Sequence, residues 1–407
     1  MTFKVKTKGQ IEGEDLLAPK LRFKEFDNNW NLVTLKSLMD FKNGINAPKD
    51  AYGKGIKYIS VTDILNNNFI TYEKIKGLVD IDSTTLENNS VTYGDVLFQR
   101  SSETIEDIGR SNVYLDANKM ATFGGFVIRG KKKGAYNPLF INYLLQNNSS
   151  RKSIIVKGAG AQHYNISQEE LEKIKVYFTT MAEQEKIGYF LSLLDKKIEL
   201  QQRKIEALKI YKKGLIQRMF NNKYNNCMKI EELIFQKSTR NSKNEIKDVY
   251  SVSNKDGFIL QSEHFKDRMV ASENTTNYKI IENDDFAYNP ARINVGSIAR
   301  MKKNKNGIIS PMYICFKCNE KILPEYLEYF FESPKFIYEM NKRLEGSVRM
   351  CLSYESMINI PIELPDKKEQ EKISNILTTL DKKVYQEEKR YTKLNELKKG
   401  LLQKMFV

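Results

Sequence analysis

Residue types that could carry out catalysis are sparse in this sequence. The chain has only two histidines, His163 and His264, and they stand in different halves. A serine-histidine-aspartate triad or a histidine metal site is therefore not expected. The segment CFKC at 315–318 offers one C-x-x-C pair, but no second pair follows at zinc spacing. We interpret these cysteines as small apolar residues of a strand, and we predict no metal site.

Motifs for nucleotide, methyl-donor or Mg²⁺ chemistry are also missing. YNPLF at 136–140 and YNPAR at 288–292 lack the second proline of adenine-methyltransferase motifs, and no glycine-rich cofactor loop accompanies them. KGAGAQ at 157–162 looks like a phosphate loop, but its counterpart EGSVRM at 345–350 shares little beyond the glycine, so we interpret both as structural turns. The acidic segment at 365–372 has the wrong spacing for a nuclease. We predict no catalytic residues.

Composition favours a folded protein with a polyanionic partner. The chain has 407 residues, enough for two or three domains, with 41% hydrophobic residues and a net charge of +15. Such a surplus of positive charge favours DNA, RNA or an anionic membrane surface. No apolar run approaches the roughly 20 residues of a membrane helix, and the N-terminus lacks a secretory h-region. Four cysteines do not build a disulfide framework, so we expect a cytoplasmic protein and no membrane partner.

The strongest pattern is an internal repeat. Residues 183–220 align without a gap to residues 369–406, with 18 identities in 38 positions, and both copies close on KKGL[IL]Q[RK]MF. Apolar residues recur at alternating steps of four and three, as in helices that pair along their length. Gln201 and Lys212 interrupt this seam, and Glu387 and Lys398 interrupt it at the matching positions. The predicted seam residues are Ile187, Leu191, Leu194, Ile198, Ile205, Leu208, Leu215, Ile373, Leu377, Leu380, Val384, Tyr391, Leu394 and Leu401.

The segments before the two helices carry short β-type runs separated by polar loops, which is typical of strands and turns. Each also contains a helical stretch followed by a glycine turn. We therefore predict an α+β fold in which two α+β domains are each followed by a long helix, and the helices pair as an antiparallel coiled coil with pseudo-twofold symmetry. The expected divisions are a leader at 1–19, a domain at 20–182, a helix at 183–220, a domain at 221–368 and a helix at 369–407.

Basic and amide side chains gather in the loops of both domains. Arginine can pair bidentately with guanine and asparagine with adenine, whereas lysine clusters usually neutralise phosphates. Each such residue alone is more simply a solvated surface charge, but two matched sets favour nucleic acid. The candidate DNA-binding residues are Arg100, Ser101, Arg110, Asn112, Arg129, Lys131, Lys132, Lys157, Asn289, Arg292, Asn294, Arg300, Lys302, Lys303 and Arg349.

The order of elements resembles the specificity (S) subunit of type I restriction-modification systems. The residues that carry the resemblance are the two EQEKI…KKGL segments, the entry LRFKEFDNNWNLVTLKSL at 21–38, and the run-ins ISQEELEKIKV and LSYESMINIPIELP. The resemblance covers nearly the whole chain. One departure is Trp30, which has no tryptophan counterpart in the second half.

The resemblance implies a non-catalytic, DNA-binding subunit of an enzyme complex. The two domains would be target recognition domains that each read half of a bipartite double-stranded DNA target. The helices would set the spacer and dock two methyltransferase (M) subunits, after which restriction (R) subunits join. S-adenosylmethionine, ATP and Mg²⁺ would belong to those partners, and this chain would hold no cofactor. The alternatives are a single-chain DNA methyltransferase or nuclease with attached recognition domains, and a non-catalytic coiled-coil scaffold.

Overall fold

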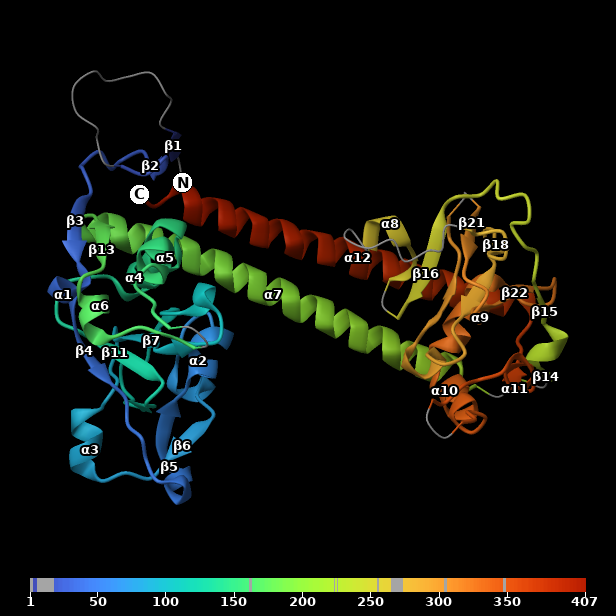
Figure 1. The fold of residues 1–407 in the computed structure, drawn as a ribbon, viewed down its shortest axis with the longest axis horizontal. Coiled ribbons are helices and arrows are strands. Elements are labelled where there is room, and N and C mark those ends of the chain that lie inside the picture. Colours follow the sequence, from blue (N-terminus) through green and yellow to red (C-terminus); the bar gives the residue numbers. More distant parts are fainter. Residues whose placement is uncertain are drawn as a thin grey trace. The chain divides into compact units, whose positions relative to one another are not determined.

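The computed structural model describes residues 3–5, 18–160, 163–222, 224, 226–254, 256–264, 274–303, 306–346 and 349–407. It divides into two compact units (Figure 1). Unit 1 comprises Met1–Gln202 and Lys389–Val407, and unit 2 comprises Arg203–Glu388. Residues 389–407, the later part of the helix expected at 369–407, belong to unit 1 and complete its core.

Two long helices contribute to both units. Helix α7 spans Met181–Met219 and helix α12 spans Lys367–Lys404, within three residues of the bounds expected from the repeat. In unit 1, Ile187 and Leu191 near the beginning of α7 share a core with Leu401 near the end of α12. In unit 2, Ile216 near the end of α7 shares a core with Ile373 near the beginning of α12. In each unit, the beginning of one long helix packs beside the end of the other, which confirms the antiparallel pairing.

The predicted seam is correct over most of both helices and shifts at the end of α7. Ten of its residues are buried, and four are only partly buried: Leu208, Leu215, Tyr391 and Leu394. In unit 2 the residue most buried near the end of α7 is Ile216, not Leu215. A straight α-helix drifts by about 20° per heptad, so four heptads after Ile187 the buried position falls one residue later. Met405 and Phe406 extend the core of unit 1 beyond the predicted seam.

Unit 1 is built from small sheets and short helices. Its principal sheet has the order β4-β11-β7-β9, a second has the order β10-β5-β6, and β13 pairs with β3 next to the long helices. The strands of unit 1 are β1 (Phe3–Val5), β2 (Leu21–Phe23), β3 (Asn31–Thr34), β4 (Met39–Asn43), β5 (Tyr52–Ile59), β6 (Gly77–Val79), β7 (Val96–Gln99), β8 (Ser101–Ser102), β9 (Ser111–Val113), β10 (Thr122–Phe123), β11 (Val127–Lys132), β12 (Tyr164–Asn165) and β13 (Lys175–Phe178). Its short helices are α1 (Leu35–Leu38), η1 (Lys49–Ala51), α2 (Val61–Asn66), η2 (Tyr72–Lys74), α3 (Ser83–Asn88), η3 (Ile105–Asp107), α4 (Pro138–Gln146), α5 (Asn148–Ile155) and α6 (Gln168–Glu172).

Unit 2 repeats this topology. Its principal sheet has the order β15-β22-β19-β20, its second sheet the order β17-β16-β21-β18, and β14 pairs with β23. Its strands are β14 (Cys227–Lys229), β15 (Ile234–Gln236), β16 (Val249–Ser253), β17 (Gly257–Leu260), β18 (Lys279–Ile281), β19 (Phe286–Tyr288), β20 (Ile298–Arg300), β21 (Gly307–Ile309), β22 (Ile314–Cys318) and β23 (Pro361–Glu363). Its short helices are η4 (Ile230–Glu232), α8 (Gln261–His264), η5 (Ile293–Val295), α9 (Pro324–Phe331), α10 (Pro334–Asn341) and α11 (Tyr354–Ile358).

The repeat therefore extends through both domains and confirms the predicted α+β fold. In each second sheet one strand pair is parallel, β5 with β10 and β16 with β21, while the principal sheets are antiparallel throughout. Cys315 and Cys318 lie buried in β22, as interpreted, and burial raises the pKa of each thiol to about 12. Within the described part of the chain, no helix combines the length and apolarity that a membrane span requires.

Trp30 distinguishes unit 1 from unit 2. Its indole Nε1 donates to the Glu183 carboxylate at 3.2 Å, and Arg22 pairs with the same carboxylate through two bonds of 2.7 and 2.8 Å. All three side chains are buried. Glu369, the counterpart of Glu183, instead accepts from Lys372 at the exposed beginning of α12. Trp30 thus belongs to a buried cluster with Arg22 and Glu183, whereas Glu369, at the position equivalent to Glu183, is paired at the surface.

Candidate nucleic-acid interface

Each unit carries a glycine hairpin at an equivalent place. In unit 1, Ala159 and Asn165 exchange two backbone hydrogen bonds of 3.0 and 2.8 Å, and in unit 2 Glu345 and Cys351 do the same at 2.9 and 2.8 Å. Gly160 and Gly346 have φ angles of 141° and 118°, where an added Cβ would collide with a backbone carbonyl across the hairpin. The interpretation of both segments as structural turns is confirmed. Residues 161, 162, 347 and 348 lie outside the described residues.

The hairpin of unit 1 lies against the end of β7. The backbone N–H of Ile166 donates to the Arg100 carbonyl at 3.1 Å, and Ser101 Oγ is hydrogen bonded to the Asn165 side chain. A hollow of about 370 Å³ opens here, lined by Arg100, Lys157 and Asn165 among others. Lys157 pairs with Glu170 at 3.1 Å, and hydrogen bonds from Lys173 and Lys157 lower the pKa of Glu170. The structure thus brings the predicted residues Arg100, Ser101 and Lys157 together.

Unit 2 has an equivalent arrangement with different side chains. The N–H of Leu352, after the hairpin, donates to the carbonyl of Pro290 at 3.0 Å, which ties the hairpin to the loop that follows β19. That loop carries Arg292 and Asn294, both exposed, and the hairpin carries the exposed Arg349. We call the two regions the hairpin surfaces: residues 100–101 with 157–165 in unit 1, and 290–296 with 345–351 in unit 2, each limited to its described residues.

Two predicted residues of unit 1 have structural roles. Asn112 is 1% exposed, and its side-chain amide donates to the carbonyls of Ile64 and Asn67 at 3.0 and 2.6 Å. Arg129 is 5% exposed, lies over the Phe123 ring at 5.4 Å and donates to the Ser90 carbonyl. Burial lowers the pKa of Arg129. The expectation that these two contact DNA is wrong, because both side chains are buried and point into the fold.

The prediction that Asn289 and Arg300 of unit 2 contact DNA is wrong for the same reason. Asn289 is 6% exposed, and its Oδ1 accepts from the N–H of Ala291 at 3.1 Å. The side chain of Arg300 is 9% exposed and pairs with three carboxylates, those of Asp284, Glu325 and Glu328. Burial alone would lower the pKa of Arg300, but Glu328 and Glu325 raise it. A guanidinium held in this way has no free edge for a base.

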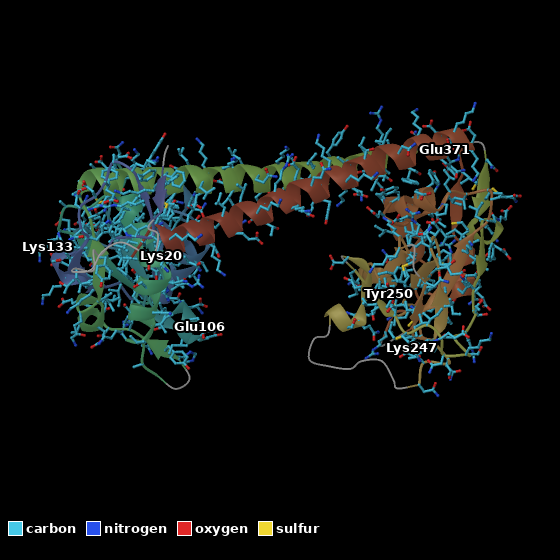
Figure 2. All side chains as sticks on the ribbon, turned by 90° about the horizontal axis from the view of Figure 1, so that it is seen from above. Lys20, Glu106, Lys133, Lys247, Tyr250 and Glu371 are labelled. Atoms are coloured by element: carbon cyan, nitrogen blue, oxygen red, sulfur yellow. The ribbon has the colours of Figure 1, made fainter. Side chains whose placement is uncertain are left out.

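The other predicted residues are at least partly exposed; the lysines lie away from the hairpin surfaces, whereas the carbonyl of Arg110 accepts from the N–H of Gln99, next to Arg100, at 2.7 Å. Strand β11 begins at Val127, which pairs with Gln99 next to Arg100, and ends at Lys131 and Lys132. About 16 Å of strand therefore separates the two lysines from Arg100. Lys132 lies over the Tyr136 ring at 4.9 Å, and Lys133 beside it is at the surface of unit 1 (Figure 2). Lys302 and Lys303 follow Arg300, which lies at the end of β20 that is farther from Asn289. Arg110 pairs with Asp107 at 2.6 Å.

A polar cluster that the sequence did not predict fixes each domain to the long helices. In unit 1, Asp195 of α7 accepts from Tyr143 Oη at 2.7 Å and pairs with Lys398 of α12 at 2.6 Å. In unit 2, Asp381 of α12 accepts from Tyr329 Oη at 2.8 Å and pairs with Lys212 of α7 at 2.8 Å. The equivalent residues are 186 positions apart. The two lysines that interrupt the predicted seam therefore hold one tyrosine-aspartate-lysine cluster in each unit.

A pair of equivalent glutamines completes the attachment. Gln184 accepts from the N–H of Asn137 at 3.0 Å before α4, and Gln370 accepts from the N–H of Leu323 at 2.9 Å before α9. Both glutamines are buried. They satisfy backbone donors at helix beginnings that have no partner within the helix. The occurrence of the same glutamine in both EQEK segments is a sequence signal that the two residues share a role. The sequence does not show which groups they contact.

Comparisons with known proteins agree with this architecture. The family model for the type I restriction modification DNA specificity domain matches twice, over residues 27–209 and 227–398. A putative type I restriction enzyme MjaX specificity subunit of Methanocaldococcus jannaschii is 26% identical over 207 residues, which is 49% of this chain and 48% of that protein. The chain thus spans about half the length of this curated relative.

Two solved structures share the fold. The crystal structure of a type I restriction-modification system S subunit from M. genitalium matches with a TM-score of 0.59 and 18% identity, covering 96% of this chain and 99% of that one. A structure described as the basis of complex assembly and conformational transition of the type I R-M system matches with a TM-score of 0.54 and 11% identity, covering 92% and 96%.

Proposed function

Because the chain belongs to the family of type I restriction-modification DNA specificity proteins, we propose that it selects the DNA sequence on which such an enzyme complex acts. Each unit would read one half of a bipartite double-stranded target. The observation that carries this proposal is the pair of hairpin surfaces, which have the same backbone framework and different side chains. A common framework with Arg100, Ser101 and Lys157 in one copy and Arg292, Asn294 and Arg349 in the other suits two different half-sites.

Within these surfaces we assign two kinds of contact. Lysine and arginine side chains would neutralise phosphates and set the position of each unit on the duplex. The amide and guanidinium groups that remain exposed, foremost Asn294 and Arg292, would read base edges. Asn112, Arg129, Asn289 and Arg300 are left out of this assignment, because they stabilise the units from inside.

The paired helices would serve as the partner-binding element. We propose that α7 and α12 dock two methyltransferase subunits, that restriction subunits join this assembly, and that the helix pair determines the unread spacer. Exposed apolar side chains on α7, including Tyr189, Leu193 and Leu200, give this surface the chemistry of a protein contact. Catalysis, with S-adenosylmethionine, ATP and Mg²⁺, would take place on the partner subunits in the cytoplasm.

The test is to co-express this chain with a cognate methyltransferase subunit and to sequence the adenine methylation of the host DNA. A split motif with a fixed gap is the expected result. Exchange of residues 20–182 for the corresponding segment of a related subunit should change one half of the motif and leave the other half unchanged. A continuous motif, or a change in both halves, would contradict the assignment of one half-site to each unit.

An assay of the purified chain alone, together with the exchange experiment, separates the alternatives. A single-chain methyltransferase or nuclease would modify or cleave DNA without any partner, so methyl transfer by the purified chain alone would favour it. A scaffold without a DNA role would leave the methylation motif unchanged after the exchange. We expect neither outcome.

A further inference from the structure

Unit 1 contains a cationic cavity that lies apart from its hairpin surface. The cavity has a volume of about 350 Å³ and is lined by the end of α2, by β9, by the junction of α4 and α5, and by the end of α12. Among the described residues that line it, Arg110, Arg151 and Lys398 are cations and none is an aspartate or a glutamate. Glu106 of η3, whose carbonyl accepts from Arg151 at this cavity, is labelled at the surface of unit 1 in Figure 2.

Two buried donors beside this cavity have no partner among the protein groups that the structure describes. Arg151 Nη2 donates to the carbonyls of Glu106 and Ile108 at 2.9 and 2.7 Å, which fixes the guanidinium plane. Its Nη1 is buried and has no hydrogen-bond partner among the described residues, and the same holds for the hydroxyl of Ser111. Buried donors are nearly always satisfied in folded proteins, so each of these two calls for an acceptor that the described protein groups do not supply.

The charges at the cavity point to the same kind of ligand. Burial and then the charge of Arg110 lower the pKa of Arg151 to about 10, so the two guanidinium groups repel each other. Arg110 is paired with Asp107, and both side chains are substantially exposed, so this pair is weak. Lys398 is held by Asp195 and contributes less. A bound anion would relieve the repulsion and accept from the unpaired donors.

The equivalent cavity of unit 2 has different chemistry. It encloses about 460 Å³ against α9 and α10, and its lining includes Glu328, Glu332 and three phenylalanines. Ile337 stands 186 positions after Arg151, and Glu332 stands 186 positions after Gln146. Burial raises the pKa of Glu332, as expected for an acid in a partly apolar site. The fold therefore creates the cavity in both units, and the side chains make only the first one suitable for an anion.

We propose that the cavity of unit 1 is a phosphate-binding site, with Arg151 Nη1, Arg110 and Ser111 Oγ as its donors. Arginine binds phosphate through paired N–H groups, and a neighbouring hydroxyl supplies a third donor. The phosphate group could come from the DNA backbone or be free inorganic phosphate. The site itself does not depend on the proposed function, and only the first of these two sources does.

The experiment is a calorimetric titration of the purified full-length chain with inorganic phosphate at constant ionic strength, with chloride as the reference anion. One site per chain is expected. Ser111→Ala and Arg110→Gln should each weaken phosphate binding by about tenfold, the effect of losing roughly one charge-assisted hydrogen bond. Arg151→Gln should abolish binding, but it also removes the bonds to Glu106 and Ile108, so the other two variants decide. Lys152→Gln, which removes an exposed cation from the same helix, is the matched control and should bind as the wild type does.

Absence of saturable phosphate binding, or equal weakening in Lys152→Gln and Ser111→Ala, would overturn the proposal. A second titration in the presence of duplex DNA identifies the source of the phosphate. Loss of the phosphate signal on addition of DNA assigns the site to the backbone, and an unchanged signal assigns it to free phosphate. Because the first titration contains no DNA, failure of DNA recognition would leave its result unaffected.

Discussion

The ammonium group of Lys398 lies 2.6 Å from Oδ1 of Asp195, so a residue near the end of α12 is bound to the first half of α7. Tyr143 donates to the same carboxylate, and Asp195 is 4% exposed as a side chain. Because Lys212 and Asp381 make the equivalent pair in unit 2, the duplicated phrase KKGL supplies one cation to each unit. The polar interruptions of the helical seam thus specify the register of the two helices, as polar residues do in other paired helices.

Asp195→Asn should destabilise unit 1. The change leaves Lys398 without its counter-charge and weakens the bond from Tyr143, which we expect to reduce the free energy of unfolding by about 1–3 kcal/mol. The fluorescence of Trp30, the single tryptophan of the chain, reports unfolding of unit 1 in urea because its ring is buried there. Asp381→Asn is the matched control in unit 2 and should shift the Trp30 transition less. Equal shifts for both variants would contradict the separate roles of the two clusters.

Gly160→Ala should disturb the hairpin surface of unit 1. A side chain at φ 141° is strained and would collide with the carbonyl of His163, at a cost of about 1–3 kcal/mol. We expect weaker binding to DNA that carries the half-site of unit 1, measured by a shift in the fluorescence anisotropy of a labelled duplex with the methyltransferase partner present. Gly214→Ala is the control, since no atom lies near its added Cβ. That change within α7 should stabilise the helix by about 0.5–1 kcal/mol. Unchanged affinity in Gly160→Ala would argue against a hairpin role.

The exposed cations of the hairpin surfaces should contribute to the salt dependence of DNA binding. Replacement of Lys157 or Arg349 by glutamine should each reduce the slope of log K against log salt by about one, because one phosphate contact is lost. Arg300→Gln serves as the contrast: it should lower stability without a specific change in that slope, because its guanidinium is committed to three carboxylates. The assignment fails if the lysine and arginine variants of the hairpins keep the wild-type slope.

Thiol reactivity should separate the four cysteines. The pKa of Cys315 and of Cys318 is raised to about 12 by burial, so almost none of either thiol is ionised at pH 8. Cys227 is exposed and should react with a chromogenic disulfide in the native protein, whereas Cys315 and Cys318 should react only after unfolding. Raising the pH from 7 to 9 should leave the two buried thiols protected, because both pKa values stay well above this range. Rapid native reaction of three or four thiols would contradict the burial of β22.

The sequence was most informative where structure repeats locally. The heptad pattern and the two EQEK…KKGL segments predict the helices and their pairing, because a helical stripe depends on residues three and four positions apart. The glycines at 160 and 346 were interpreted correctly as turns, because left-handed backbone favours glycine whatever surrounds it.

Prediction failed where the role of a residue depends on distant segments. Asn112 and Arg129 were assigned to DNA because their residue types suit it, but each faces inward from its strand toward partners from other segments. Arg151 was not predicted at all, although it lies at the cationic cavity, because its neighbours Arg110 and Ser111 come from a strand about 40 positions earlier. A sequence shows the chemistry of each side chain. It does not show which side chains face the same cavity or surface.

Phe406 packs on Trp30, with ring centroids 6.1 Å apart, and this contact has a consequence for synthesis on the ribosome. Unit 2 is made from one continuous stretch and can fold as soon as residues 203–388 have emerged. Unit 1 must wait for residues 389–407, although its other residues are translated first. At roughly 5–20 residues per second, the core around Trp30 stays open for about 10–40 s after residue 202 has been added. Unit 1 is therefore translated first but completes its folding last, so it is the unit that is available to chaperones for longer.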